Sequence, residues 1–161
     1  MSAGAAGPDT VGAAGGHPLE VLHAALRGVV AAMAMTGARV LTVELGLVRE
    51  TPPQAIARRK ARGLVRRIPR RRRRGTIELA HWAVGAGGGA AFGALPDEVR
   101  RQPWAGPAYG LLFWLGFELV IAPALGLGYA LRARPGERTA LAADHVLYGL
   151  VLSELRTRPR T

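Results

Sequence analysis

Four long apolar stretches alternate with polar segments along the chain. They cover residues 26–48, 76–95, 106–131 and 139–155. An α-helix rises about 1.5 Å per residue, so about 20 residues cross the roughly 30 Å hydrocarbon layer of a bilayer. The third stretch exceeds this length, the first two reach it, and the fourth is marginal. The pattern therefore predicts an all-α fold in which four transmembrane helices form a bundle.

A soluble bundle of hydrophobic helices is the alternative, because Ala and Gly are weak membrane formers. Residues 106–131 argue against it. A soluble helix of that length shows a polar stripe, whereas this stretch carries a single charge, Glu118. Aromatic rings near the segment ends also suit the headgroup layer of a membrane. These rings are Trp82, Trp104, Tyr109 and Tyr129.

The segments outside the four stretches are predicted to be tails. Residues 1–25 are rich in Gly and Ala and lack the basic and compact apolar regions of a signal peptide. We expect them to form a flexible tail outside the fold. Residues 156–161 form a second, short tail, so the predicted membrane domain covers residues 26–155.

The positive charge is concentrated in the loop over residues 49–75. Of the 22 basic residues, twelve lie between Arg49 and Arg74 beside one acid, Glu50, and twelve minus one gives the whole net charge of +11. With four spans, the first and third loops carry 15 Lys and Arg, against 5 in the second loop and the C-terminal tail. The positive-inside rule then places the 49–75 loop in the cytoplasm of a bacterial inner membrane, and both termini outside.

Residues 51–69 within this loop predict a basic amphipathic helix. Thr51 and Gln54 have capping-box spacing, two prolines occupy the first turn, and Pro69 ends the helix. Apolar and basic side chains fall on opposite sides, so we expect the helix to lie on the anionic lipids of the leaflet. The predicted lipid contacts are Arg58, Arg59, Lys60, Arg62, Arg66 and Arg67.

The Arg-rich stretch at residues 58–74 allows a second interpretation. It would make the protein a membrane-tethered binder of nucleic acid or of an acidic partner. The stretch has no aromatic side chains among its arginines, and it matches no recognisable nucleic-acid-binding module. Lipid is therefore the preferred partner and nucleic acid the alternative.

Glycines recur at every fourth position on the second stretch, at Gly85, Gly89 and Gly93. In lipid, the hydrophobic effect does not drive helices together. Small residues let helix backbones approach closely, and this close packing holds the helices together instead. The first stretch repeats the spacing from Ala24 to Thr36, and the third does so at Gly106 and Gly110. We expect the second helix to lie at the centre of the bundle or to form the seam of a homo-oligomer. Chance in a Gly- and Ala-rich chain is the alternative.

Six polar side chains are predicted to form a cluster within the membrane: Arg39, Glu44, His81, Glu118, Asp144 and His145. Arg39 and Glu118 are expected near the centres of their spans, where an unpaired charge costs about 2.5 to 3.5 kcal/mol. Their similar depth predicts an ion pair between them. In a structural interpretation the cluster holds the bundle in register. In a functional one it lines a polar cavity for protons, a cation or a small solute.

No catalytic constellation stands out along the chain. There is no cysteine, the two histidines of the cluster have no metal-ligand spacing, and the Gly-rich run lies inside a predicted span instead of between a strand and a helix. We expect no enzymatic activity, no metal and no cofactor. The predicted function is that of a small multi-span membrane protein, either a structural or accessory component or one that handles protons or a small solute.

Three segments carry a resemblance to a known family. They are "RGVVAAMAMTGARVLTVELGLVRETPPQAIA", "HWAVGAGGGAAFGAL" and "DHVLYGLVLSEL". With them the chain resembles the small bacterial integral membrane proteins of the YagU-like type over most of residues 26–155. The resemblance implies a helical, multi-span inner-membrane protein, and it supplies no activity or catalytic residues. The Arg-rich insert at residues 58–74 departs from that pattern.

Overall fold

The chain folds into helices alone throughout its described part. The computed structural model describes residues 18–48, 51–127 and 133–154, and no strand occurs among them. This confirms the predicted all-α class. Residues 1–17, 49–50, 128–132 and 155–161 lie outside the described part, and with them the predicted interfacial ring of Tyr129.

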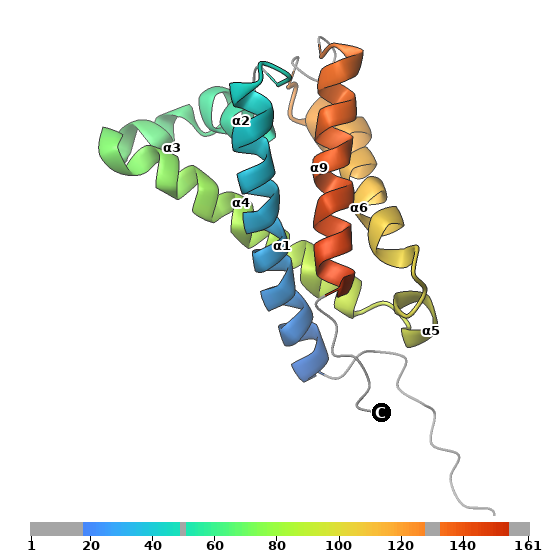
Figure 1. Cartoon of the computed structure of the whole chain (residues 1–161). Coiled ribbons are helices and arrows are strands. Elements are labelled where there is room, and N and C mark those ends of the chain that lie inside the picture. The colour runs from blue at the N-terminus through green and yellow to red at the C-terminus, as the bar shows by residue number, and fades with distance from the viewer. Residues whose placement is uncertain (1–17, 49–50, 128–132, 155–161) are drawn as a thin grey trace, which may run out of the picture.

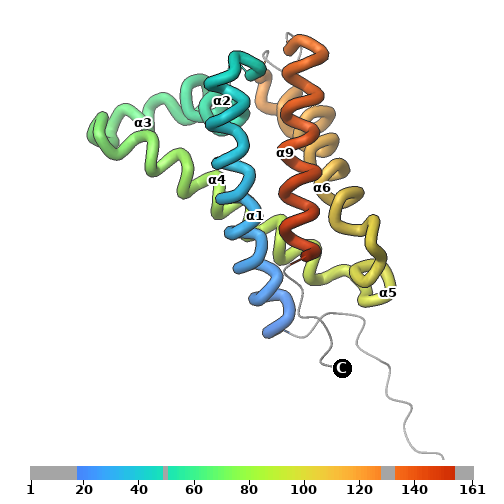
Figure 2. Tube along the Cα trace, viewed as in Figure 1, coloured from blue at the N-terminus to red at the C-terminus, as the bar shows by residue number. Residues whose placement is uncertain are grey.

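Four long helical units alternate in direction along the bundle (Figure 1). They are α1 (Pro18–Glu44), α4 (Arg70–Gly93), α6 (Ala105–Gly116) and α9 (Pro135–Glu154). The Cα trace in Figure 2 shows α1 and α9 side by side. Helix α4 crosses α1 obliquely, and α6 lies alongside α9. An up-and-down order of this kind places both described ends of the chain at the same end of the bundle.

The first long helix begins earlier than the sequence pattern predicts. It starts at Pro18 instead of residue 26, so residues 18–25 belong to the fold and the predicted tail is too long. Ala24 is the reason, because this buried residue packs against Gly93 of α4 and the contact extends the bundle toward the N-terminus. The helix ends where Gly46 adopts a positive φ of 69°, a conformation that favours glycine.

The predicted amphipathic helix over residues 51–69 is divided into α2 (Pro52–Arg59) and α3 (Arg62–Arg67). The start is as predicted, since the Thr51 N–H donates to Gln54 Oε1 over 3.4 Å. The break comes at Lys60 and Ala61, whose N–H groups both donate to the Ile56 carbonyl over 2.8 and 3.0 Å. Two donors on one carbonyl close α2 and turn the chain into α3.

The run of arginines is helical. Pro69 precedes α4, which begins at Arg70, so the second long helix starts before residue 76 and takes in residues 70–74. Proline favours the start of a helix because its missing N–H has no partner to lose there. The predicted loop over residues 49–75 is therefore mostly helix.

The third apolar stretch forms a composite helix. After α6 come a π-helical segment, η1 (Phe117–Ile121), and α7 (Ala122–Ala124). The helix ends before Gly126, whose φ is 59°, and the Leu127 N–H closes it by donating to the Ala122 carbonyl over 2.9 Å. This helix is shorter than the predicted span over residues 106–131.

Two close crossings join the helices in pairs. Gly28 of α1 lies against Gly85 and Gly89 of α4, and a methyl group on Gly28 would collide with the Gly85 carbonyl. In the second pair, Gly110 of α6 and Gly149 of α9 meet backbone to backbone. The predicted glycine face of the second span is thus covered by α1 of the same chain.

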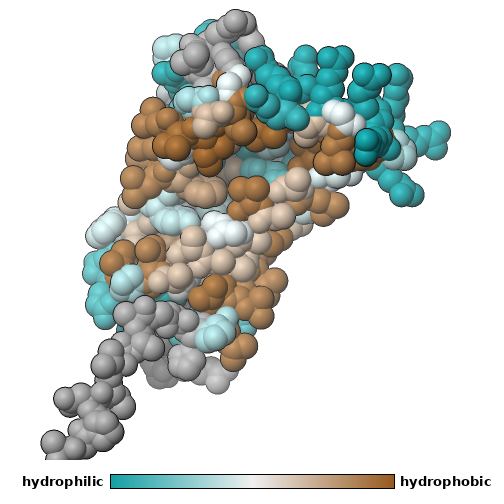
Figure 3. Space-filling model, turned by 180° about the vertical axis from the view of Figure 1, so that it is seen from behind, coloured by the Kyte–Doolittle hydropathy of each residue, from teal (hydrophilic) through white to brown (hydrophobic). Residues whose placement is uncertain are grey.

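The buried core is small. Its main cluster lies where α1, α4, α6 and α9 meet and consists of Ala31, Ala32, Met35, Phe92, Ala105, Tyr148 and Leu152. Much of the remaining apolar surface faces outward, as the face shown in Figure 3 makes clear.

Within the described ranges, two helices are long and apolar enough to cross a membrane. They are Pro18–Glu44 and the composite helix Ala105–Ala124. Core helices of soluble proteins and signal sequences meet the same criterion, so the observation is weak evidence by itself. The four predicted spans are therefore reduced to two candidates by length and composition, because the part of α4 that follows its arginines is rich in glycine and α9 carries several charges.

Candidate functional site

Three helices bring charged and polar side chains together in the interior. Arg39 of α1 lies with Nη2 3.4 Å from His81 Nε2 of α4 and with Nε 3.8 Å from Asp144 Oδ2 of α9. The side chains of Arg39 and Asp144 are only 6% and 4% exposed. Three of the six residues predicted to cluster within the membrane therefore meet, and we call Arg39, His81 and Asp144 the buried cluster.

His145 follows Asp144 but points to another helix. Successive residues of an α-helix differ by about 100° in direction, so the two side chains cannot share one contact. The His145 ring packs against Phe113 of α6, with 6.2 Å between ring centroids. Its Nδ1 lies 2.7 Å from the Leu141 carbonyl, which makes Nδ1 the donor. His145 thus borders the buried cluster and contributes to the α6–α9 contact.

The predicted ion pair between Arg39 and Glu118 is wrong. Arg39 pairs with Asp144, whereas Glu118 Oε1 lies 3.7 Å from Arg138 Nε at the start of α9. Helix length explains the difference. Because α1 runs from Pro18 to Glu44, Arg39 lies in its last third and not at its centre.

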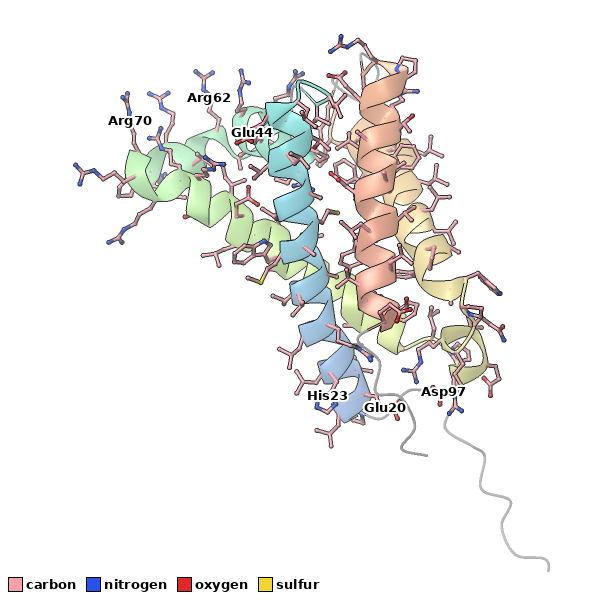
Figure 4. The ribbon with its side chains drawn as sticks, viewed as in Figure 1. Glu20, His23, Glu44, Arg62, Arg70 and Asp97 are labelled. Carbon is pink, nitrogen blue, oxygen red and sulfur yellow. The ribbon has the colours of Figure 1, made fainter. Side chains whose placement is uncertain are left out.

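Glu44 does not join the buried cluster. It is exposed at the end of α1, as Figure 4 shows. A helix rise of about 1.5 Å per residue puts it roughly one turn beyond Arg39, where the bundle has opened. The predicted set of six residues thus separates into the buried cluster, its neighbour His145, the Glu118–Arg138 pair and an exposed Glu44.

A second polar layer lies one turn below the buried cluster along α1. The indole N–H of Trp82 donates to Thr36 Oγ1 over 3.1 Å, and this oxygen lies 3.3 Å from Glu78 Oε2. The sequence pattern assigned Trp82 to the headgroup layer because the second span was expected to begin at residue 76. With α4 beginning at Arg70, Trp82 lies midway along the helix and faces α1.

Two tyrosines make contacts that the sequence analysis missed. The hydroxyl of Tyr148 donates to the Gly85 carbonyl and that of Tyr109 to the Gly88 carbonyl, both over 2.6 Å. Glycine leaves the carbonyls of its helix open to a second donor, because no side chain covers them. The sequence did contain a signal for these contacts, namely a Gly-rich helix together with other helices that carry tyrosine.

The buried cluster leaves one acceptor incompletely satisfied. Asp144 Oδ2 is buried and has no hydrogen-bond partner among the described residues, since its ion-pair contact with Arg39 is longer than a hydrogen bond. Such an oxygen can accept a proton or a bridging water. No group of three or more potential metal ligands is present in the described ranges.

The predicted lipid contacts lie at one end of the molecule. Arg58, Arg59, Lys60, Arg62, Arg66 and Arg67 are all exposed on α2, α3 and the turn between them. Figure 4 shows Arg62 and Arg70 pointing away from the bundle. The buried cluster and these basic residues are therefore separate features, one inside the bundle and one outside it.

Comparison with known proteins gives no relative. No protein-family model, curated protein or solved structure matches the chain. The resemblance to YagU-like proteins accordingly stays a prediction, and function has to be inferred from the residues themselves.

Proposed function

We propose that this protein is a small multi-pass membrane protein of the bacterial cytoplasmic membrane, with four helical passes and its Arg-rich end in the cytoplasm. One observation carries the proposal. In the most apolar windows of Pro18–Glu44 and Ala105–Ala124, only 28% and 22% of the residues are buried. A helix in the core of a soluble protein would be mostly buried, so these apolar faces call for lipid as their solvent.

The exposed apolar side chains extend along both candidate spans. On α1 they run from Leu19 to Val43, and on the composite helix they include Leu112 and Leu119, which are 65% and 68% exposed. Soluble monomers rarely expose contiguous apolar patches of more than a few hundred Å². An apolar belt that faces outward on two different helices favours a bilayer over water.

The charges of α4 and α9 are compatible with two further passes. Asp144 faces Arg39 inside the bundle, Glu118 pairs with Arg138, and the arginines of α4 lie at its first turns. Charged residues within membranes usually face the interior of a bundle and pair there. At the opposite end of the bundle, Arg100 contacts Asp97 and Glu20. Most charges are therefore paired inside the bundle or gathered at its two ends.

Within the membrane, we assign a structural role to the buried cluster. We propose that the protein is an accessory component without enzymatic activity. Arg39, His81 and Asp144 come from α1, α4 and α9, so their contacts join the two helix pairs. Breaking such a set leaves a charge in a medium of low dielectric constant, which strongly favours one arrangement of the helices.

Proton handling is a second candidate function, and the buried Asp144 Oδ2 favours it. A buried acceptor that has no donor among the described residues, in a cluster that also contains His81, is a place where a proton can be held. Proton flux into proteoliposomes tests this function. Asp144→Asn should abolish the flux, while Glu118→Gln, which alters a pair whose Arg138 side chain is 46% exposed, should leave it intact. Equal proton flux in both variants would mean that the buried cluster has a structural role only.

Membrane insertion can be tested by extraction. After washing with high salt and alkaline carbonate, the protein should stay with the membrane and should leave it only with detergent.

Topology can be tested by labelling single cysteines. The chain has no cysteine, so each of the variants Gln54→Cys and Gln102→Cys reports on one position. We expect labelling from opposite sides of the membrane. A monodisperse protein in a detergent-free cytosolic extract would overturn the proposal.

A further inference from the structure

An arm of the molecule carries a high concentration of positive charge. We define the basic arm as residues 58–74, at the end of α2, in α3 and in the first turns of α4. From Thr51 to Ile77 the chain has eleven Lys and Arg and no Asp or Glu. Most arginines of the arm are exposed and form no ion pair with any described residue: Arg62, Arg66, Arg67, residues 70–72 and Arg74.

The basic arm is folded and fixed to the bundle. Arg73 donates from Nε to the Ile68 carbonyl over 3.0 Å and from Nη2 to the Arg66 carbonyl over 3.3 Å, which fastens α3 to the start of α4. At the base of the arm, Ala55 of α2 is buried with Ala122 and Leu127 at the end of α7. The positive surface is thus held in one orientation relative to the bundle.

Apolar side chains accompany the arginines. Leu64 of α3 is 66% exposed and Leu79 of α4 is 61% exposed. Seen from behind in Figure 3, apolar residues lie directly beside the hydrophilic end of the molecule. A surface that presents both kinds of side chain suits the boundary between lipid headgroups and acyl chains.

The position of the basic arm fits the edge of the apolar belt. The arm extends sideways at the end of the bundle where α1 stops and α9 begins (Figure 1). Exposed apolar residues on α1 and η1, such as Val43 and Leu119, reach the same end. If the apolar belt marks the hydrocarbon layer, the arm lies at the level of the headgroups.

We propose that the basic arm binds the phosphate groups of anionic phospholipids in the leaflet around this end of the bundle. The inference rests on the membrane location proposed above. Guanidinium groups donate two parallel hydrogen bonds to phosphate oxygens, which favours Arg over Lys for such contacts, and ten of the eleven basic residues in this segment are Arg. Nucleic acid offers the same phosphates, but the segment from Thr51 to Ile77 has no aromatic side chain on which a base could stack.

The test places an environment-sensitive fluorophore at Leu64→Cys in the full chain, reconstituted into nanodiscs. One set of discs contains phosphatidylcholine alone and the other adds phosphatidylglycerol. We expect emission at shorter wavelength, with quenching by brominated acyl chains, only in the anionic discs. Replacing Arg62, Arg66 and Arg70 by Gln should remove both effects. A fluorophore at Gln102→Cys, at the other end of the bundle, is the matched control and should not respond.

The outcomes separate this inference from the proposed function. A chain that enters the discs while its Leu64 label ignores lipid charge overturns lipid binding and leaves the membrane location standing. A shift that persists in the Gln variant also overturns it. A shift produced by a single-stranded oligonucleotide in neutral discs, at lower phosphate concentration than the lipid requires, would assign the arm to nucleic acid. A chain that enters no disc overturns the membrane location itself.

Discussion

The glycine crossings and the buried cluster hold the helices together in opposite ways. Where α1 and α4 touch, Gly28 meets Gly85 and Gly89 with no side chain between the backbones. Two turns further along α1 the contact is made by Thr36 and Trp82, and beyond that by Arg39 and His81. Side chains thus lengthen as the oblique helices separate. Glycine sets where two helices cross, and long polar side chains fill the space that the crossing angle opens.

Breaking the buried cluster should have the largest effect on stability. Asp144→Asn removes the charge that faces Arg39 and should lower the free energy of unfolding by about 3 to 5 kcal/mol, because a buried charge loses its partner. Denaturation in mixed micelles, followed by far-UV circular dichroism, measures the loss. Glu118→Gln is the control, since Arg138 in its pair is 46% exposed, and should cost about 0 to 1 kcal/mol.

The pairing within the cluster predicts strong coupling. Adding Arg39→Gln to Asp144→Asn should recover part of the lost stability, because the double variant leaves no uncompensated charge. Strictly additive losses would show that the two side chains do not act as a pair.

The glycine crossings should be the next most sensitive. A methyl group at Gly149 would collide with the Gly106 carbonyl, and one at Gly28 with the Gly85 carbonyl. Gly149→Ala and Gly28→Ala should each lower the free energy of unfolding by about 1 to 3 kcal/mol, through overpacking against backbone that cannot yield.

Each crossing offers a control on one of its two helices. A methyl group at Gly116 or Gly37 meets nothing within 4 Å, so Gly116→Ala and Gly37→Ala should be neutral or slightly stabilising, as alanine favours helix over glycine. Equal melting temperatures for the crossing and control variants would mean that glycine has no packing role here.

Tyr148 links the two regions and should have a smaller effect. Its hydroxyl donates to the Gly85 carbonyl, which already belongs to the hydrogen-bonding pattern of α4. Tyr148→Phe should therefore cost only about 1 kcal/mol, the usual net value of one hydrogen bond. The same micelle denaturation measures it, and a loss as large as that of Asp144→Asn would contradict the ranking.

Asp97 lies outside both regions and should give the stability of the protein a small dependence on pH. Hydrogen bonding from Arg101, together with the charge of Arg100, lowers the pKa of this exposed carboxyl below its ordinary 3.8. Its contribution to stability is therefore present above pH 3.8 and disappears as the pH falls through the lower folded-state pKa. The pH dependence of thermal unfolding should weaken in this range in Asp97→Asn, while a profile unchanged by the substitution would remove Asp97 as its cause.

The local sequence pattern predicted which segments are helical better than it predicted where each helix begins and ends. The length of the apolar stretches and the small-residue spacing predicted the four long helices and the glycines that pack, since both depend on residues close in sequence. The start of α1 and the extension of α4 to Arg70 were missed, because helix ends depend on contacts such as that of Ala24 with Gly93. Charge content suggested buried pairing, but depth estimated from wrong helix ends led to Glu118 as the partner of Arg39.

The sequence by itself determined the all-helical class, the concentration of charge in one segment and the presence of acids and histidines in apolar helices. These properties follow from composition and local order along the chain. Only the tertiary structure decided that Arg39 meets Asp144 and His81, that α1 covers the glycine face of α4, and that the basic arm projects from the bundle. Each of these depends on the angle and register between helices, and such geometry arises from contacts between residues far apart in the sequence.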